Sequence, residues 1–448
     1  MQKMKNGKKV LSVCLSLAMA AGMLSTSAFA SWNVYGGSDN HNAVVTEAPT
    51  GTPTVASINL LNSNSGWDGV DNVPLLQTEN GVTYAYVLYD GHAAGAHLAK
   101  IDCEAAIEKA QSGEDIYKAA TEWDVQLESS SGFQLSTPVL HDDTVYAATN
   151  SGKIYAVSTE SGEKELVTSV STGQINTPLT IYGDYLYFGT WVGNGSIEGS
   201  REPGRYYQLN LNDYTDMQSV SSIERGFYWA GAVSDGTNIY FGGDDGYLYY
   251  RPVGAGFGTK SDVEIKNTAL KLTDVASDAG NVRSTIMMDE DGLLYFTTQG
   301  GYLWCCSYED GLMVEWKAKL GATSTSTPTK VGDRIYVGYY SGFNAGGVQC
   351  VTVSFDEEEN VVTSVAPVAS GFPVQSSIVV MGDGTGTDYL YFNTNAQKGA
   401  GYCYSYDGTT GSKVWGTTGD TYALGGMAID NGYAVFGNDY NHLYVVHD

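Results

Sequence analysis

The chain has 448 residues, with 50 acidic against 23 basic side chains and a formal net charge of -27. Charged residues make up 16% and aromatic residues 12%, which leaves ample apolar surface to bury and excludes a disordered chain. The negative net charge argues against a protein that binds the phosphate backbone of nucleic acid through clustered Lys and Arg. The 55 Gly and 33 Tyr residues favour strands joined by tight turns.

Residues 1–30 are predicted to be a secretory signal peptide. Four lysines precede an apolar run from Val10 to about Leu24, and small residues at the -3 and -1 positions predict cleavage after Ala30. A retained membrane helix is the alternative, but the run is shorter than the ~20 residues that a bilayer requires. Cys14 lies too early in the run for a lipoprotein signal. We therefore expect a secreted or envelope-associated protein with no stable membrane insertion.

Cleavage would make the net charge of the mature chain more negative. It removes four of the 23 basic residues and none of the 50 acidic ones, which leaves 19 bases and a net charge of -31. A charge of this size favours solubility and disfavours anionic partners.

The remainder of the chain is a repeat. A short strand, an acidic turn, an aromatic-rich strand, a Gly turn and a third strand recur, which is typical of an all-β domain. The aromatic-rich strand occurs eight times at a spacing of about 41 to 62 residues, near that of four-stranded propeller blades. Its copies are Val82–Tyr84, Val145–Tyr146, Leu186–Phe188, Ile239–Phe241, Leu294–Phe296, Ile335–Val337, Leu390–Phe392 and Ala434–Phe436.

These repeats predict that residues 31–448 form a single β-propeller domain of four-stranded antiparallel blades. Eight blades is the prediction and seven the runner-up, because the first and last copies are the weakest. The chain ends in the third strand of the eighth copy, so we expect an N-terminal strand from about residues 32–61 to complete that blade and close the ring. Insertions are expected at Cys103–Ala110, as a short helix, and in the stretches Trp191–Arg205 and Val253–Ser277.

One repeat carries a recognisable sequence motif, Tyr404–Trp415, with an Asp, a Thr-Gly turn and a Trp on the predicted fourth strand. Leu312–Trp316 is a poorer copy, and Trp32–Gly37 with His41 is similar to the start of many such chains. These motifs resemble the PQQ-like β-propeller repeat of quinoprotein alcohol dehydrogenases and many exported binding proteins. The resemblance implies a propeller but not a function, because this fold hosts enzymes, scaffolds and receptors. Only two of the eight blades carry a convincing Trp, which favours the non-enzymatic type.

Five cysteines remain after cleavage, an odd number that does not suggest a disulfide framework. In quinoprotein dehydrogenases a disulfide between adjacent cysteines covers the quinone, so Cys305-Cys306 is the candidate pair here. The pair falls on a predicted third strand, where neighbouring side chains point to opposite faces. We therefore favour buried thiols over a redox pair. PQQ and Ca²⁺ are possible cofactors but not favoured, and no cofactor is assigned.

Acidic turns are the candidate metal sites. Ca²⁺ prefers several oxygen ligands, but Asp and Gly are also ordinary turn formers, and none of the turns has the spacing of a calcium loop. The six His residues are scattered without zinc spacing. No metal ligand or catalytic residue is therefore assigned. The four turns are Asp244–Gly246, Asp289–Gly292, Asp356–Glu359 and Asp383–Asp388.

The mouth of the central channel is the predicted binding site. The first strands of the blades line such a channel, and their starts are small and polar, with one charge and one large aromatic residue. A channel mouth with so few ionisable groups is better suited to binding than to acid–base catalysis, which requires pairs of titratable groups. Aromatic side chains beside the mouth could stack on a sugar or peptide, although Trp229 could equally pack between blades. The predicted ligand-binding residues are Arg283, Trp229, Tyr228, Gln375, Asn176, Ser136 and Ser326.

We therefore expect a monomeric, exported propeller that acts as a binding or scaffold protein for a protein, a peptide or a cell-envelope glycan, with no nucleic acid partner. The alternative is a PQQ-dependent quinoprotein-like oxidoreductase. A third class is a propeller glycosidase or lyase, which would need paired carboxylates in the channel.

Overall fold

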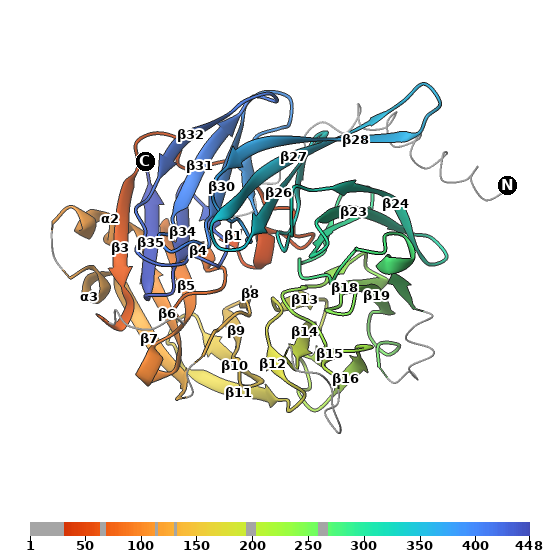
Figure 1. Ribbon diagram of the computed structural model, residues 1–448. Helices are drawn as coiled ribbons and strands as arrows, with labels where there is room; N and C mark the ends of the chain where they lie inside the picture. Colours follow the sequence, from red (N-terminus) through yellow and green to blue (C-terminus); the bar gives the residue numbers. More distant parts are fainter. Residues whose placement is uncertain (1–30, 63–68, 113–114, 130–131, 194–202, 259–267) are drawn as a thin grey trace. The chain divides into compact units, whose positions relative to one another are not determined.

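Eight antiparallel sheets follow one another along the chain and surround a common axis (Figure 1). The structure is a computed structural model that describes residues 31–62, 69–112, 115–129, 132–193, 203–258 and 268–448. Within these ranges the eight sheets confirm eight blades rather than seven. The predicted signal peptide lies outside the described residues, as do 194–202 and 259–267 of the predicted insertions.

The blades are numbered in chain order, and each runs from an inner to an outer strand. Blade 1 holds β4 (Leu75–Glu79), β5 (Val82–Asp90), β6 (Ala96–Asp102) and β7 (Thr121–Glu128); blade 2 holds β8 (Val139–His141), β9 (Thr144–Ala148), β10 (Lys153–Ser158) and β11 (Lys164–Ser169). Blade 3 holds β13 (Thr180–Tyr182), β14 (Tyr185–Trp191), β15 (Arg205–Asn210) and β16 (Met217–Ser221), with β12 (Gln174–Ile175) also paired to β14. Blade 4 holds β17 (Val233–Ser234), β18 (Asn238–Gly242), β19 (Tyr247–Pro252) and β20 (Ala269–Lys271).

The second half of the ring repeats this order. Blade 5 holds β21 (Met287–Met288), β22 (Leu294–Thr298), β23 (Tyr302–Tyr308) and β24 (Leu312–Lys319); blade 6 holds β25 (Thr329–Val331), β26 (Arg334–Ser341), β27 (Ala345–Phe355) and β28 (Val361–Ser370). Blade 7 holds β29 (Val379–Met381), β30 (Asp388–Asn393), β31 (Gly401–Tyr406) and β32 (Gly411–Gly416). Blade 8 holds β33 (Ala428–Asp430), β34 (Tyr433–Gly437), β35 (His442–His447) and, as its outer strand, β3 (Thr54–Asn59).

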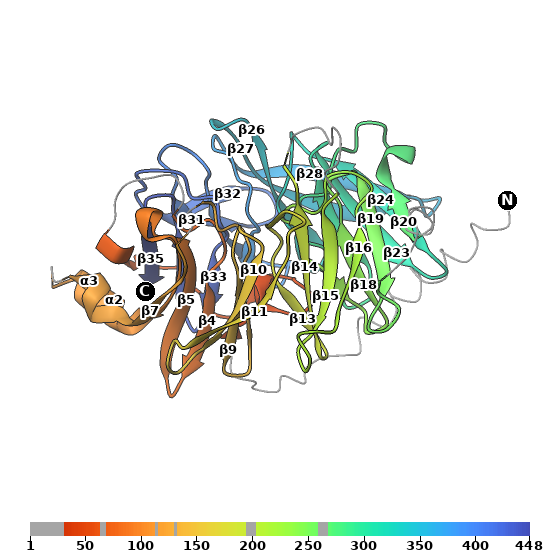
Figure 2. The same ribbon diagram turned by 90° about the horizontal axis from the view of Figure 1, so that it is seen from below.

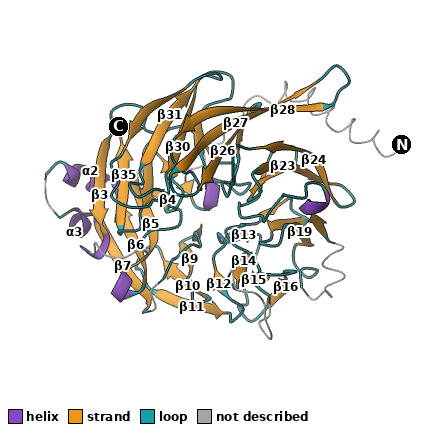
Figure 3. Cartoon of the chain, viewed as in Figure 1, coloured by secondary structure: helices purple, strands orange, loops and turns teal. Residues whose placement is uncertain are grey.

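Each predicted aromatic-rich strand is the second strand of a blade, and it is apolar on both faces because both faces are covered by neighbouring blades. One core cluster joins Tyr295 and Leu303 of blade 5 to Ile335 and Val351 of blade 6. Figure 2 shows the blades from the side, and Figure 3 shows that the fold consists almost entirely of strands and loops.

The ring is closed by the N-terminal strand, as predicted. β3 pairs antiparallel with β35, from Thr54 opposite His447 to Asn59 opposite His442. Two helices from blade 1, α2 (Cys103–Ala110) and α3 (Ile116–Ala120), lie beside β3 (Figure 1). The first coincides with the predicted insertion, and its residues share a core cluster with Ala56 and Ile58 of β3. The helices therefore cover an outer strand that would otherwise present an unpaired edge.

Residues 31–50, here called the N-terminal strap, run past the inner strands before they reach β3. The strap begins as β1 (Ser31–Trp32), which pairs with β4, and ends with β2 (Val44–Val45), which pairs parallel to β29. Between them lies a short 3-10 turn, η1 (Tyr35–Gly37). Gly37 has a φ of +68°, and a Cβ there would lie 2.5 Å from the Trp32 ring, so the turn requires glycine.

Backbone and side-chain atoms of the strap together form hydrogen bonds to five blades. Leu140 donates to the carbonyl of Asn33, Met288 to that of Asn40 and Val380 to that of Ala43. The ring nitrogens of His41 lie 2.7 Å from the carbonyl oxygens of Tyr35 and Ala232. The side chain of Asn42 bonds both backbone groups of Lys330, and the Pro49 carbonyl accepts from Tyr391 and Trp415. One segment thus ties together the inner strands of the ring.

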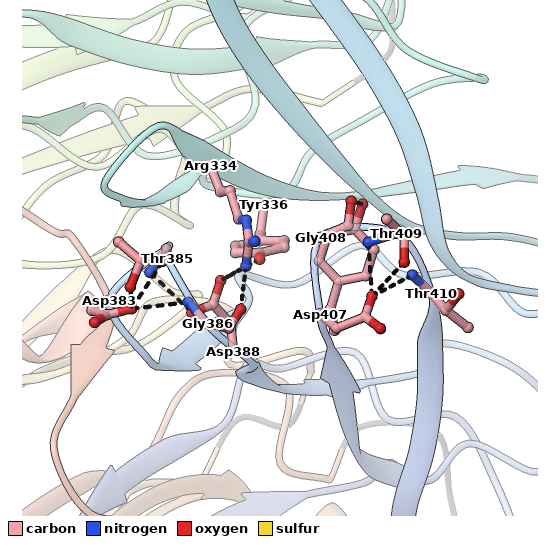
Figure 4. A network of polar contacts seen from close by, with 12 residues as sticks. Arg334, Tyr336, Asp383, Thr385, Gly386, Asp388, Asp407, Gly408, Thr409 and Thr410 are labelled. Carbon is pink, nitrogen blue, oxygen red and sulfur yellow. Dashed lines mark hydrogen bonds and ion pairs between the residues drawn. The ribbon is translucent and has the colours of Figure 1, made fainter.

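Ion pairs add a second kind of contact between blades. Arg334 of blade 6 donates through Nη1 to Asp388 of blade 7 at 2.8 Å, and the Tyr336 hydroxyl donates to the same carboxylate at 2.6 Å (Figure 4). Asp388 is fully buried. Figure 4 also shows two exposed turns, in which Asp383 and Asp407 accept hydrogen bonds from their own loops. The buried Asp388 therefore joins two blades, whereas the exposed Asp383 and Asp407 stabilise their own turns.

Candidate functional site

Segments that precede the first strands of all eight blades line one cavity of about 50 Å³ on the central axis. The lining includes Asp71 and Asn72 ahead of blade 1, Trp229 ahead of blade 4, Arg283 ahead of blade 5 and Gln375 ahead of blade 7. The first strands begin three or four residues later than the sequence suggested, so these residues lie in the segments that lead into the strands.

The strap reaches the same cavity from the side toward which the first strands run. Tyr35 lines the cavity, and its hydroxyl lies 3.0 Å from Thr327 Oγ1. The strap bonds Leu140, Met288 and Lys330, which lie farther along their strands than the lining residues. The channel is therefore obstructed by the strap on that side, and the predicted mouth is the opposite one.

The structure brings four of the seven predicted site residues together and separates three. Trp229, Arg283 and Gln375 line the cavity, and Tyr228 lies against Trp229 with ring centroids 4.8 Å apart. Ser136, Asn176 and Ser326 are buried and do not line it. Ser136 Oγ donates to the Thr177 carbonyl at 2.7 Å, which joins blade 2 to blade 3.

Small polar residues around the channel bond from blade to blade. Thr137 Oγ1 accepts from Val73, Thr285 Oγ1 accepts from Gly231, and Thr327 Oγ1 accepts from Thr285. Thr325 Oγ1 donates to the Gln375 carbonyl, and Asn393 Nδ2 donates to the Gly425 carbonyl. Much of the small polar character that the sequence shows at the strand starts therefore supports the ring rather than a ligand.

Arg283 is held rigidly at the mouth. Its Nε donates to Asp244 Oδ1 at 2.6 Å and its Nη2 to Asp244 Oδ2 at 2.9 Å, a two-pronged contact that fixes the guanidinium plane. Asp244 is fully buried and also accepts from Trp191 Nε1 and Asn281 Nδ2, both at 2.9 Å. The remaining N–H groups of Arg283 are free of this pairing, so the guanidinium can still donate to a ligand.

Aromatic rings surround this arginine. Its guanidinium carbon lies 4.4 Å from the centroid of the Tyr228 ring and 5.8 Å from that of Trp191. The Trp191 and Tyr228 rings meet edge to face at 4.7 Å. Burial raises the pKa of Tyr228 to about 12, although Arg283 opposes the shift, so the phenol is neutral at ordinary pH. We call Trp191, Tyr228, Trp229 and Arg283 the aromatic–arginine cluster.

The backbone also marks this cluster. Trp229 has a φ of +59°, an uncommon conformation for a bulky residue that surrounding contacts must impose. Its carbonyl accepts from Thr285 Oγ1 at 3.1 Å, and the Gly231 N–H donates to the same carbonyl at 3.0 Å. These contacts fix the backbone of Trp229, which lines the cavity.

Sequence reasoning missed Asp244, Trp191, Tyr35 and Asp71 as members of this region. Asp244 stood only among the acidic turns, and Trp191 only at the start of an insertion. Their relation to Arg283 depends on contact between three successive blades, which no local pattern encodes. Tyr35 enters from a segment far away in the sequence.

The residues do not fit a PQQ site. A site for a cofactor of drug size requires about 300–1,000 Å³, far more than the axial cavity offers. Cys305 packs in a cluster toward blade 6 and Cys306 in a cluster toward blade 4, so the two thiols diverge across their sheet as predicted. Both are free and fully buried, and burial raises the pKa of each. They cannot cover a ligand in the channel.

The cavity lining also lacks the pair of carboxylates that a glycosidase uses. Among the described residues that line it, Asp71 is the single acid. The acidic turns are occupied by other contacts. Asp289 binds Lys330 and Tyr295, Asp356 accepts from Asn360, and Asp383 accepts from Thr385. Within the described ranges, no three His, Cys, Asp or Glu residues gather as a metal site.

The buried carboxyl of Asp245, which follows Asp244 in the chain, should make the stability of the folded protein depend on pH. Burial raises its pKa to about 6, although hydrogen bonds from Tyr249 and the Ile223 N–H oppose the shift. The native state therefore keeps a proton that the unfolded chain releases near pH 4. The stability from this group is full below about pH 4 and is lost as the pH rises through about 6.

Asp245→Asn should therefore gain stability relative to the wild type as the pH rises from about 4 to about 6. Urea unfolding at closely spaced pH values measures the difference in the free energy of unfolding between the two proteins. A difference that stays constant across this window would show that the carboxyl titrates alike in the folded and unfolded states.

The comparisons with known proteins agree with the propeller fold. Residues 105–210 match a family of PQQ-like repeats described as outer membrane protein assembly factor BamB. Among curated protein sequences none matches the chain. BamB from Moraxella catarrhalis superposes with a TM-score of 0.54 at 12% identity, covering 88% of this chain and 98% of that one. The computationally designed protein Ika8 superposes with a TM-score of 0.52 at 11% identity, covering 91% and 99%. The resemblance to PQQ-like propellers is thereby confirmed.

Proposed function

We propose, from the premise that this chain is a propeller of the PQQ-like repeat type, that it binds a protein or peptide partner at the channel mouth and acts as a scaffold in the cell envelope or outside the cell. The aromatic–arginine cluster carries the proposal. Trp, Tyr and Arg are the residues that dominate the energy of protein interfaces, above all where they are fixed before binding. Asp244 fixes Arg283, and the packing of Trp191 and Trp229 fixes Tyr228.

The comparisons support the class of partner. BamB is described as an assembly factor for outer membrane proteins, and its fold is similar over most of both chains. A protein partner for the present chain is an extension of that likeness. Among the described residues no helix is long and apolar enough to cross a membrane. Export through cleavage after Ala30 and a monomeric state belong to the same proposal.

Chemistry in the cavity favours binding over the alternatives. The oxidoreductase requires room for a quinone, and the glycosidase or lyase requires a second carboxylate, and neither requirement is met by the described lining. The charge of Arg283 is balanced by Asp244, so its free N–H groups suit the neutral carbonyl oxygens of a polypeptide.

Arg283→Ala should reduce the amount of a specific partner captured by the mature protein at least about tenfold, as expected for an interface hot spot. The bait is residues 31–448, and the prey is the envelope and secreted fraction of the source cell. Quantitative mass spectrometry compares capture by the wild type and the variant, and binding of the purified candidate is then measured by calorimetry.

Arg334→Ala is the matched control. Arg334 also pairs with a buried aspartate of a neighbouring blade and lies over a tyrosine ring. It differs in position, because it begins the second strand of blade 6, whereas Arg283 precedes the first strand of blade 5. Equal loss in both variants would indicate a general defect in the ring. Full capture by Arg283→Ala would show that partners bind elsewhere.

A further inference from the structure

A second, larger cavity lies between blades 2 and 3, away from the axis. Its volume is about 680 Å³, within the range of ligand pockets. Its walls are the β9–β10 turn, the segment between β11 and β12, and the end of β14. We call it the blade 2–3 groove. Its lining residues are Asn150, Ser151, Val170, Ser171, Thr172, Gly173, Gln174, Trp191, Val192 and Gly193.

The chemistry of the groove is uniform. Its described lining holds three hydroxyl and two amide side chains and no charged one. Hydroxyls and amides both donate and accept hydrogen bonds, which matches the hydroxyl groups of a sugar. Ser171 and Gln174 are exposed and Asn150 is half-buried, so these groups face solvent rather than a core.

Trp191 supplies a flat apolar surface in the same groove. It is half-buried, and its Nε1–H donates to Asp244, which is not part of the lining. The edge-to-face contact with Tyr228 holds the indole from the same side as Asp244. An aromatic ring fixed in this way beside hydroxyl and amide groups can pack on the apolar face of a sugar ring.

An extended peptide is less well matched to the groove. The N–H groups of Asn150, Gly152, Val170 and Val192 already donate within the protein. β12 is paired to β14 through Gln174 and Ile175. A peptide that adds a strand requires a continuous row of free backbone groups, and these bonds interrupt such a row along the described walls.

We propose that the blade 2–3 groove binds a neutral oligosaccharide, as a second site that adjoins the channel mouth at Trp191. The net charge of -27 disfavours an anionic polysaccharide, and the described part of the lining holds no charged side chain that could compensate for that repulsion. Trp191 stacks on one sugar ring, while Asn150, Ser171 and Gln174 bond hydroxyl groups along the chain.

The test uses purified residues 31–448 with cellohexaose, maltohexaose and chitohexaose as neutral probes, hexagalacturonic acid as an anionic probe and a Gly-Ser-Thr decapeptide as a peptide probe. Calorimetry and saturation-transfer NMR report binding up to about 10 mM, which covers the weakest specific complexes. At least one neutral hexasaccharide should bind, and neither the acid nor the peptide should.

Gln174→Ala and Asn150→Ala should each weaken that binding about fivefold or more, because each removes hydrogen-bonding groups that line the groove. Gln174 Oε1 also accepts from Asn176 Nδ2 at 3.4 Å, so the Tm of each variant is compared with that of the wild type. Gln397→Ala, an exposed glutamine in the β30–β31 loop of blade 7, is the control and should bind as the wild type does. Trp191→Phe keeps a ring and should retain more binding than Trp191→Ala.

Failure of all three neutral probes, or binding that Gln174→Ala and Asn150→Ala leave intact, would overturn the proposal, and so would binding of the peptide alone. Gln375→Ala should leave sugar binding unchanged, since Gln375 lines the axial cavity and does not line the groove. The outcome is therefore independent of whether a protein binds at the channel mouth.

Discussion

A chain that begins at Leu60 should accumulate as aggregate rather than as a soluble ring. Such a chain lacks the strap and β3, so β35 keeps β34 but loses its outer partner along six residue pairs, and the inner strands lose the contacts that tie them together. The helices α2 and α3 lose the strand that they cover. Domains are stable by only about 5–15 kcal/mol, so losing one strand of a closed ring together with the strap should abolish the native state.

Refolding of residues 60–448 beside residues 31–448, followed by gel filtration and thermal unfolding, measures this effect. Adding a synthetic peptide of residues 31–59 should restore part of the soluble ring, because the missing strand pairs through backbone hydrogen bonds alone. A chain from residue 46 onward, which keeps β3 but lacks most of the strap, should fold with a lowered Tm. A Leu60 chain with the Tm of the full chain would mean that ring closure contributes little.

Asp388→Ala should destabilise the ring by about 3 kcal/mol, since it leaves the Arg334 guanidinium and the buried Tyr336 hydroxyl without their shared acceptor. The Gly384 N–H loses its acceptor as well. Because the pair joins blades 6 and 7, the loss should lower the midpoint of global unfolding in urea rather than fray one turn.

Two variants calibrate this result. Asp388→Asn keeps the shape and one acceptor oxygen and should lie between the wild type and the alanine variant. Asp407→Ala removes only the bonds of an exposed turn (Figure 4) and should have a much smaller effect. If Asp407→Ala costs as much as Asp388→Ala, then turn formation and not the buried pair determines stability here.

The blade count could be read from the sequence because it rests on a local pattern. An aromatic and β-branched strand such as Leu390–Phe392 must be apolar on both faces to lie between two sheets, and that requirement recurs at each copy. The helix at Cys103–Ala110 was equally legible, because Asp102 caps it and its composition is helical. The second helix, α3, was missed because its five residues are too few to show a period.

The candidate site could be predicted only in part from the sequence. Arg283 and Trp229 stand out as one charge and one large ring among small residues, and the structure places both at the cavity. Ser136 looked like a ligand-facing hydroxyl, but it bonds to the next blade. Whether a hydroxyl faces a ligand or a neighbouring carbonyl depends on the spacing of adjacent blades, which is a property of the closed ring and not of any one repeat.

The pairing of β3 with β35 also has a consequence in time. A ribosome releases residues 54–59 long before residues 442–447. The strand β3 therefore has no pairing partner until synthesis is almost complete. Contacts between such distant positions make folding slow, since the loop must close before the pairing gains any free energy. The last step of folding should therefore be ring closure. Until that step, β35 would have an open edge to which a chaperone or a second nascent chain could add a strand.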